Sequence, residues 1–147
     1  MDILRRNTDY ALRLMTSLAR NYENGSVSTR VLADEQKVSY QLACKLMQRL
    51  HGARLVDSCM GPKGGFRLRR APEQISLLEV VEVIQGPIRL NRCLLSDTAC
   101  PRGGDCPIRA RITELQGHME EYLNNVTVGD LVKAPKPEMK QRQVNRK

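Results

Sequence analysis

Three of the five cysteines in this 147-residue chain lie within the segment "CLLSDTACPRGGDC". They are Cys93, Cys100 and Cys106, with six residues between the first two and five between the last two. Thiolates bind zinc and iron–sulfur clusters, and they also take part in redox exchange. Three thiols are one too many for a disulfide and one too few for a closed four-ligand site. The segment therefore leaves open a metal or cluster site, redox-active thiols and structural cysteines.

The spacing of these cysteines differs from the paired CxxC pattern of a zinc ribbon, which weakens the zinc interpretation without removing it. The N-terminal sequence "MDILRRNTDYALRLM" has scattered charges and no continuous apolar run, so we expect no signal peptide. The longest apolar-rich run, "ISLLEVVEVI", is too short to span a membrane. We therefore expect a cytoplasmic protein, and clustered cysteines in a reducing compartment favour metal or redox chemistry over a disulfide framework.

The net charge of +8 is unevenly distributed along the chain. Residues 1–70 carry 13 Lys and Arg against 6 Asp and Glu, a net of +7, whereas residues 71–132 carry 5 against 9, a net of −4. Residues 133–147 carry 6 against 1 and contain almost nothing apolar, which predicts a disordered basic tail. A basic first half indicates contact with a polyanion, although a merely solvated basic surface is the alternative.

The elements that position these groups begin with three predicted helices. Apolar residues recur at helical spacing after a cap at Thr8 or Asp9, and this first helix is expected to end at Asn24–Gly25. Its inward face is Ala11, Leu14, Met15, Leu18 and Tyr22. Ser28 is the expected cap of a short second helix that carries Val31, Leu32 and Ala33. Ser39 is the expected cap of a third helix that places Leu42, Ala43, Leu46, Met47 and Leu50 inward.

Two short helices joined by a tight turn predict a helix-turn-helix. The sequence "LVDSC", "MGPKGG", "FRLRR" then reads as strand, turn and strand, which is a β-hairpin wing. The expected fold class is mainly α with a small β-hairpin, a winged helix-turn-helix, and a helical bundle with an incidental hairpin is the alternative. The residues expected to contact DNA lie on the outer face of the third helix and in the wing: Ser39, Tyr40, Gln41, Lys45, Gln48, Arg49, Gly61, Lys63, Gly64 and Gly65.

Two further helices are predicted after the wing. Ser76 and Glu79 have the spacing of a capping box, and the helix they open ends by Gly86–Pro87. Pro107 suits the first position of a long helix whose apolar stripe has little core left to join, which predicts a dimer seam. The stripe is Ile108, Ile112, Leu115, Met119, Tyr122 and Leu123. The expected organisation is a DNA-binding domain (1–85), a cysteine loop (86–106), the dimerisation helix with a short helix capped by Thr127 (107–132), and the tail (133–147).

Together these segments resemble the IscR/NsrR/RirA-type regulators, which are dimeric winged-helix transcription factors that sense iron–sulfur status, nitric oxide or iron. The resemblance covers residues 3–132, and it rests on the three cysteines and on "NTDYALRLM", "VSYQLACKLMQRLHGARLV", "GPKGGFRL", "ISLLEVVEVIQG" and "LNNVTVGDLV". It implies an iron–sulfur cluster bound by Cys93, Cys100 and Cys106 near a homodimer interface. It also implies double-stranded DNA as the partner.

The resemblance also bears on the fourth cluster ligand. IscR-like members have a histidine three residues after the last cysteine, where this chain has Arg109, which cannot bind iron. NsrR-like members contribute an aspartate from the partner chain, and "TDYALR" places Asp9 at that position, so the resemblance favours a [4Fe-4S] over a [2Fe-2S] cluster. The alternative is that Asp9 only caps its helix. Met60 stands where members often carry an arginine before the wing glycine, so their DNA sequence preference does not transfer.

The sequence predicts a transcriptional regulator that represses its target genes and whose binding to DNA depends on the cluster. One alternative is a cluster-free winged-helix regulator with a thiol switch or a zinc site. Another is a small iron–sulfur carrier without a DNA role, against which the basic third helix and the wing argue. An enzyme is not expected, because the sequence has no carboxylate pair, nucleophile–base motif or phosphate-binding loop.

Overall fold

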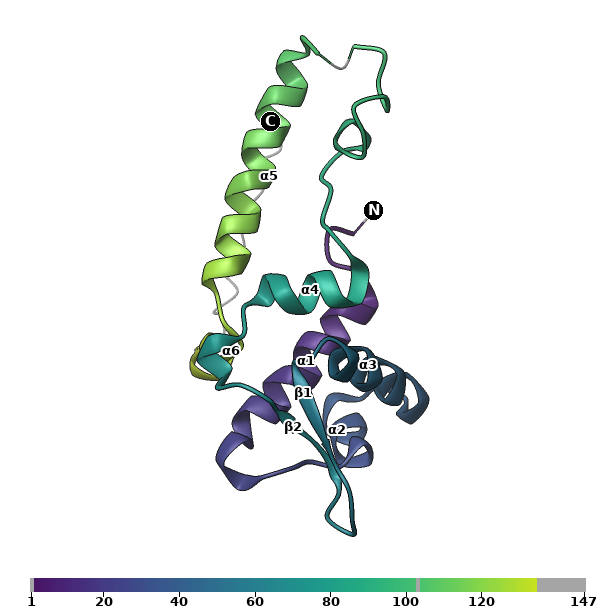
Figure 1. Ribbon diagram of the computed structural model, residues 1–147, viewed down its shortest axis with the longest axis vertical. Helices are drawn as coiled ribbons and strands as arrows, with labels where there is room; N and C mark the ends of the chain where they lie inside the picture. The colour runs from purple at the N-terminus through teal and green to yellow at the C-terminus, as the bar shows by residue number, and fades with distance from the viewer. Residues whose placement is uncertain (1, 103, 135–147) are drawn as a thin grey trace, which may run out of the picture.

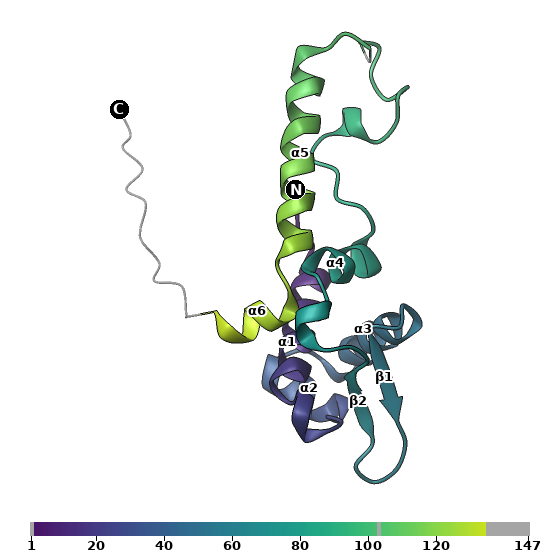
Figure 2. The same ribbon diagram turned by 60° about the vertical axis from the view of Figure 1, so that its left-hand side comes forward.

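The computed structural model describes residues 2–102 and 104–134. A small helical body carries the β-hairpin at one end, and the long helix α5 extends away from the body beside the cysteine loop (Figure 1, Figure 2). The elements are α1 (Arg6–Arg20), η1 (Tyr22–Asn24), α2 (Thr29–Gln36), α3 (Tyr40–Gly52), β1 (Val56–Cys59), β2 (Gly65–Leu68), η2 (Pro72–Gln74), α4 (Leu77–Gln85), η3 (Arg92–Leu94), α5 (Pro107–Asn125) and α6 (Val128–Lys133). The predicted fold class is confirmed. The predicted basic tail lies, from residue 135 onward, outside the described residues.

The core lies between α1, α3 and α4. Ala11, Leu14 and Met15 of α1 are fully buried, as the helical spacing predicts. The predicted inward residues Ala43, Leu46, Met47 and Leu50 of α3 are at most 2% exposed, and Leu42 is partly buried. One predicted inward residue is wrong, since Tyr22 is 43% exposed. Val31, for which no facing was predicted, is 45% exposed. Tyr22 lies beyond the end of α1, and Val31 occupies the outer side of the short helix α2.

The start of α1 differs from the predicted cap at Thr8 or Asp9. The helix begins at Arg6, its N-cap is Arg5, and Asp9 lies within its first turn. The side-chain oxygen of Gln85 accepts hydrogen bonds from the Arg5 backbone N–H (2.9 Å) and from the hydroxyl of fully buried Thr8 (2.7 Å). A side chain from α4 therefore takes the place of a local cap, which the sequence of α1 alone could not reveal. The helix also ends earlier than predicted, at Arg20.

The turn between α2 and α3 follows the local sequence. Ser28 accepts a hydrogen bond from the Val31 N–H, and Ser39 accepts one from the Leu42 N–H, so both predicted caps are confirmed. Lys37 ends α2 in the left-handed conformation, with φ of 55°. A left-handed residue that closes one helix just before a cap opens the next gives the sharp turn of a helix-turn-helix.

The wing is an antiparallel hairpin in which Val56 pairs with Leu68 and Cys59 pairs with Gly65. The structure adds a third segment that the sequence analysis missed. Val27 and Phe66 exchange both backbone hydrogen bonds, at 2.8 and 2.9 Å, so the residues before α2 extend the sheet. This pairing attaches the wing to the helix-turn-helix and fixes the two relative to each other.

Helices α4 and α6 both begin with capping boxes, at Ser76/Glu79 and at Thr127/Asp130. The box at Ser76 was predicted, and at Thr127 a cap was predicted without the reciprocal Asp130 contact. A β-bridge between Ser76 and Thr127 brings the two helix starts together. Helix α6 then packs against α1, with Val128 fully buried. The chain thus returns to the winged-helix body after α5, which itself buries no residue.

Glu79 makes the stability of this body depend on pH. Burial opposes its ionisation, but hydrogen bonds from Arg70 (2.8 Å) and from the Ser76 N–H (3.0 Å) outweigh that effect and lower the pKa of Glu79 below its usual 4.5. A lowered pKa contributes stability that is present above the unfolded value and is lost as the pH falls through the folded value.

We therefore expect Glu79→Gln to reduce the free energy of unfolding near pH 7 by about 0.5–1 kcal/mol, at the lower part of the capping range because the pair is partly exposed. The difference from the wild type should shrink below the lowered pKa, where the wild-type carboxyl is also neutral. Urea unfolding at several pH values measures this, with Glu82→Gln, an exposed neighbour, as the matched control. A difference that does not change with pH would contradict the assignment.

Candidate DNA-binding face and cysteine loop

The outer face of α3 carries the predicted DNA-contacting side chains together. Tyr40, Gln41, Lys45 and Gln48 are all exposed. The Ser39 hydroxyl caps the N-terminus of the helix, where backbone N–H groups favour a phosphate. A helix that presents amide, ammonium and phenol groups on one side can hydrogen-bond base edges in a major groove.

Tyr40 is positioned by two neighbours. Its pKa is raised above 10.0, chiefly by a hydrogen bond with the thiol of Cys44, while the Arg30 charge acts in the opposite direction. The Arg30 guanidinium of α2 lies 5.0 Å from the centre of the Tyr40 ring. Cys44 is only partly buried and belongs to this face.

Arg49 differs from the other residues of this face. Its guanidinium Nη1 donates a hydrogen bond to the backbone carbonyl oxygen of Ile84 in α4, at 3.0 Å. Arg49 was predicted to contact DNA, and nothing in the local sequence indicates this contact, because the two residues are 35 positions apart.

The glycines of the wing are required by the backbone of the hairpin itself, apart from any close contact between the wing and DNA. Gly61 has φ of 107°, in the left-handed region that favours glycine. A Cβ atom on Gly65 would overlap the Val27 carbonyl, so the sheet extension requires glycine there. Gly64 closes the turn by donating its N–H to the Gly61 carbonyl oxygen, at 2.8 Å. Lys63 is exposed at this turn, and the neighbouring Met60 is 96% exposed.

The three cysteines lie at different points of the loop between α4 and α5. Cys93 is in η3, Cys100 is in the irregular part, and Cys106 is the N-cap of α5. All three are free thiols and partly exposed, and a hollow of about 520 Å³ lies beside Cys106. Among residues 2–102 and 104–134, no three His, Cys, Asp or Glu side chains come together in a way that could hold a metal ion.

The donor chemistry of this loop nevertheless fits an iron–sulfur cluster. Three free thiols on one segment are the ligand type that such clusters require. The segment can rearrange, because none of residues 91–102 or 104–106 is buried. Arg109, at the position of the IscR-like histidine, forms an ion pair with Asp97 at 2.7 Å and so attaches the loop to α5.

Asp9, the residue expected to supply the fourth ligand, lies on α1 and is not gathered with the cysteines of its own chain. Its carboxylate is half-exposed and pairs with Arg13 at 2.8 Å. Together with Leu12, Leu77 and Leu131, it lines a hollow of about 380 Å³ between α1, α4 and α6.

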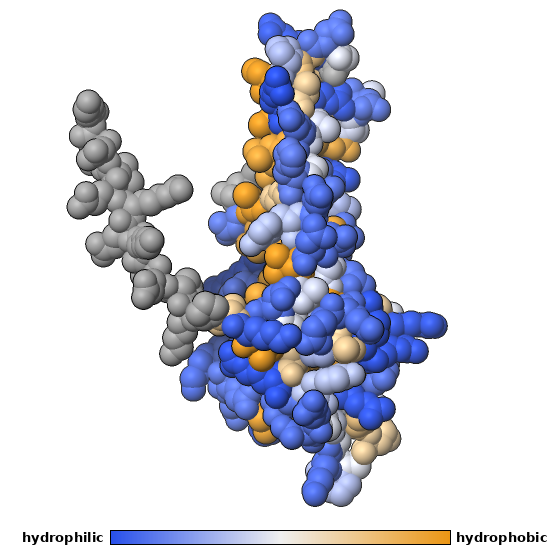
Figure 3. Space-filling model, turned by 90° about the vertical axis from the view of Figure 1, so that its left-hand side faces the viewer, coloured by the Kyte–Doolittle hydropathy of each residue, from blue (hydrophilic) through white to orange (hydrophobic). Residues whose placement is uncertain are grey.

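Helix α5 exposes the predicted apolar stripe. Ile108 is 67% exposed, Leu115 is 55% exposed and Tyr122 is 67% exposed. Figure 3 shows hydrophobic side chains gathered along this upright part of the molecule.

No helix within residues 2–102 and 104–134 is both long and apolar enough to cross a membrane.

A helix-turn-helix with a polar outer helix, followed by a hairpin wing that pairs with it, defines a winged-helix DNA-binding protein. The chain belongs to the Rrf2 family, whose model, described as an iron-dependent transcriptional regulator, matches residues 4–134. This confirms the predicted family and a DNA-binding role in transcription, and the related proteins are regulators rather than enzymes.

Individual relatives agree with this assignment. The chain is 32% identical over 123 residues to the HTH-type transcriptional regulator IscR of Cronobacter sakazakii, covering 84% of this chain and 75% of that protein. The fold is similar to that of T. potens IscR, with a TM-score of 0.72 and 24% identity over 88% of this chain and 85% of the other. It is also similar to CymR, the global cysteine regulator of B. subtilis, with a TM-score of 0.76 and 22% identity over 92% and 100% of the two chains.

Proposed function

We propose that this protein is a homodimeric repressor whose affinity for DNA depends on an iron–sulfur cluster, through which it senses iron–sulfur status, nitric oxide, iron or redox state. Cys93, Cys100 and Cys106 are the proposed ligands from one subunit, and Asp9 of the partner subunit is the proposed fourth. A [4Fe-4S] cluster is favoured over a [2Fe-2S] cluster. Repression is the proposed direction because a bound dimer blocks the DNA that it covers.

The observation that carries this proposal is the place of the three free thiols. The loop that bears them joins α4 of the winged helix directly to α5. A bound cluster supplies iron–thiolate bonds that fix all three cysteines at one point. Fixing or releasing the thiolates changes the path of the loop, and the loop contacts both the DNA-binding body and the proposed dimer helix. This is the two-state element that a regulator requires.

Asp9 has the properties of a cluster ligand that dissociates easily. Its carboxylate oxygen is a weaker partner for iron than a thiolate, and Arg13 competes for the same charge at 2.8 Å. The hollow lined by Asp9, Leu12, Leu77 and Leu131 is the surface on which we place the partner's cysteine loop. A site assembled from two subunits is consistent with the separation of Asp9 from the cysteines of its own chain.

The exposed stripe on α5 supports the dimer. A protruding helix with three large apolar side chains more than half exposed needs a partner surface in water. A twofold pairing of α5 also places two recognition helices on one duplex, which matches the usual two half-sites of such regulators.

The test is to purify the protein without oxygen and count iron and sulfide per monomer, in the wild type and in Asp9→Ala. We expect about four irons in the wild type and a clear loss in the variant, because a four-iron cluster needs a ligand for each iron. Asp34→Ala, an exposed carboxylate on α2, is the matched control and should keep the wild-type count. A colourless, iron-free protein after anaerobic reconstitution would sink the cluster proposal, and two irons unaffected by Asp9→Ala would remove Asp9 from the site.

A second candidate function follows from the partial exposure of all three thiols in a loop that does not gather them. Such thiols are accessible to oxidants, so a cluster-free regulator with a thiol switch is the alternative. The same metal analysis separates the two, since the thiol switch carries no iron and a zinc site carries zinc without sulfide. Failure to retain DNA at any salt concentration would instead favour an iron–sulfur carrier.

A further inference from the structure

The last turn of α4 is joined by hydrogen bonds to α3 and to the segment that leads into α1. Arg49 of α3 reaches the backbone of Ile84, and the side chain of the next residue, Gln85, binds the segment that leads into α1. These contacts join positions that are 35 and 80 residues apart in the sequence. The cysteine loop begins at the following residue, Gly86.

Arg49 meets a backbone group that its own helix leaves without a partner. The carbonyls of the last turn of a helix have no intrahelical N–H to accept from. The Ile84 carbonyl is one of these, and the Arg49 guanidinium donates to it at 3.0 Å. The charge of the donor is also favourable at the negative end of the α4 dipole. The recognition helix is therefore attached to the end of α4 by a charged hydrogen bond.

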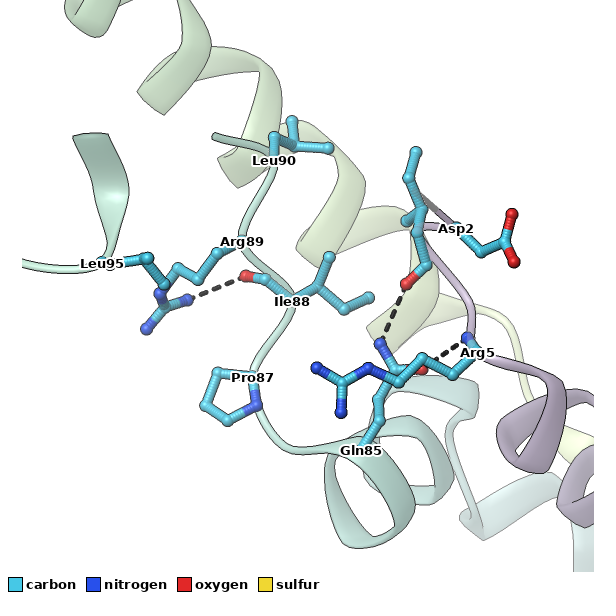
Figure 4. A pocket seen from close by; sticks show the side chains of 9 residues that line it. Asp2, Arg5, Gln85, Pro87, Ile88, Arg89, Leu90 and Leu95 are labelled. Carbon is cyan, nitrogen blue, oxygen red and sulfur yellow. Dashed lines mark hydrogen bonds between the residues drawn. The ribbon is translucent and has the colours of Figure 1, made fainter. Parts of the chain in front are cut away.

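Gln85 attaches α1 to the same turn. Its amide oxygen accepts from the Arg5 N–H and the Thr8 hydroxyl, and its amide nitrogen donates to the Ile3 carbonyl oxygen at 2.9 Å. Figure 4 shows Gln85 between the N-terminal segment and the start of the loop. Thr8 is fully buried, and Gln85 is partly buried.

The start of the loop is anchored as firmly as the end of α4. Gly86 has φ of 80°, a conformation that favours glycine, and it is followed by proline. Ile88 is 3% exposed, and the Leu90 N–H donates to Gln116 of α5 at 3.2 Å. Displacement of the loop or of α5 therefore moves the last turn of α4, because short, restrained backbone joins them.

We propose that Arg49 and Gln85 are positioning residues that transmit the state of the loop to the recognition helix and to α1. Arg49 thus serves to orient α3 rather than to read bases. The regulatory meaning of this coupling rests on the proposed function above, whereas the mechanical attachment does not depend on a cluster.

The mechanical part is tested on reduced, iron-free protein by amide hydrogen exchange. Arg49→Met keeps the length of the side chain and removes its donors, and Lys45→Met is the matched control on the same face. We expect Arg49→Met to raise exchange in the second half of α3 and in the last turn of α4, with Lys45→Met unchanged and Arg49→Lys intermediate. The proposal is overturned if Arg49→Met and Lys45→Met give the same exchange pattern.

The regulatory part is tested by the ratio of DNA affinities between cluster-loaded and cluster-free protein. The probe is a duplex selected from a random-sequence library by the cluster-loaded wild type. We expect a wild-type ratio in the range of about 5–150 that is typical of allosteric coupling, reduced to about one in Arg49→Met and retained in Lys45→Met. If Arg49→Met weakened the DNA affinity of the cluster-loaded and the cluster-free protein equally, the ratio would be retained. Arg49 would then act only as a DNA contact, and the proposal would be overturned. If the wild-type protein itself has a ratio of one, cluster-dependent DNA binding, and with it the proposed function, fails. The hydrogen-exchange experiment still tests whether Arg49 attaches α3 to the end of α4.

Discussion

Alanine at any one of Cys93, Cys100 and Cys106 is expected to abolish cluster uptake and, with it, the difference in DNA affinity between loaded and cluster-free protein. Each change leaves two thiolates and one carboxylate of the four proposed protein ligands. The fold should survive, because none of the three side chains is buried. Substitutions at such exposed positions change the free energy of unfolding by no more than about 0.5 kcal/mol.

The measurement is iron and sulfide per monomer, together with DNA affinity before and after removal of the cluster. Cys59→Ser, in β1 of the wing, is the matched control, since it changes a partly exposed thiol outside the loop. It should keep both the iron and the response. If all three loop variants responded to cluster removal as the wild type does, the loop would not be the sensor.

Glutamate at Leu115 is expected to convert the dimer to a monomer. The side chain lies in the middle of the exposed stripe of α5 and is 55% exposed in the single chain. Because each dimer contains two copies, a loss of about 2 kcal/mol of apolar burial per side chain raises the dissociation constant about a thousandfold. The introduced charge adds a desolvation cost at the seam. Affinity for a DNA probe with two half-sites should then fall at least about a hundredfold. The reason is that a monomer binds each half-site separately, whereas the dimer binds the second half-site without a further association step.

Sedimentation equilibrium at several concentrations measures the first effect, and titration of the two-half-site probe measures the second. Gly117→Glu is the matched control, because residue 117 lies on the opposite side of α5 and a Cβ there meets nothing within 4 Å. It adds the same charge to the same helix and should leave a dimer. A Leu115→Glu protein that remained dimeric would place the interface elsewhere.

Much of the fold follows from short stretches of sequence. The caps at Ser28, Ser39, Ser76 and Thr127 and the proline that opens α5 were all predicted, because each depends on residues within one turn of the helix it starts. The inward faces of α1 and α3 were largely predicted for a similar reason, since helical spacing places apolar residues on one side. The error at Tyr22 lies where α1 has already ended, at Arg20, so the helical spacing no longer applies.

The features of the candidate site can also be separated into those that local sequence predicts and those that depend on distant residues. The polar outer face of α3 and the three loop thiols were predicted from residue type and spacing, and the structure places the α3 residues together. The internal role of Arg49 was missed, because its partner is a backbone carbonyl, which has no signature in the sequence. The reason for Gly65 was missed because the overlapping atom belongs to Val27, in another segment.

The sequence by itself determined which segments form helices and wing, which groups could bind iron, and which family the chain resembles. Only the tertiary structure decided how these parts are joined. Gln85 in place of a local cap for α1, Arg49 on the end of α4, and Val27 paired with the wing each link residues at least 35 positions apart. Local propensity and periodicity act over a few residues, whereas such contacts exist only after the chain has packed.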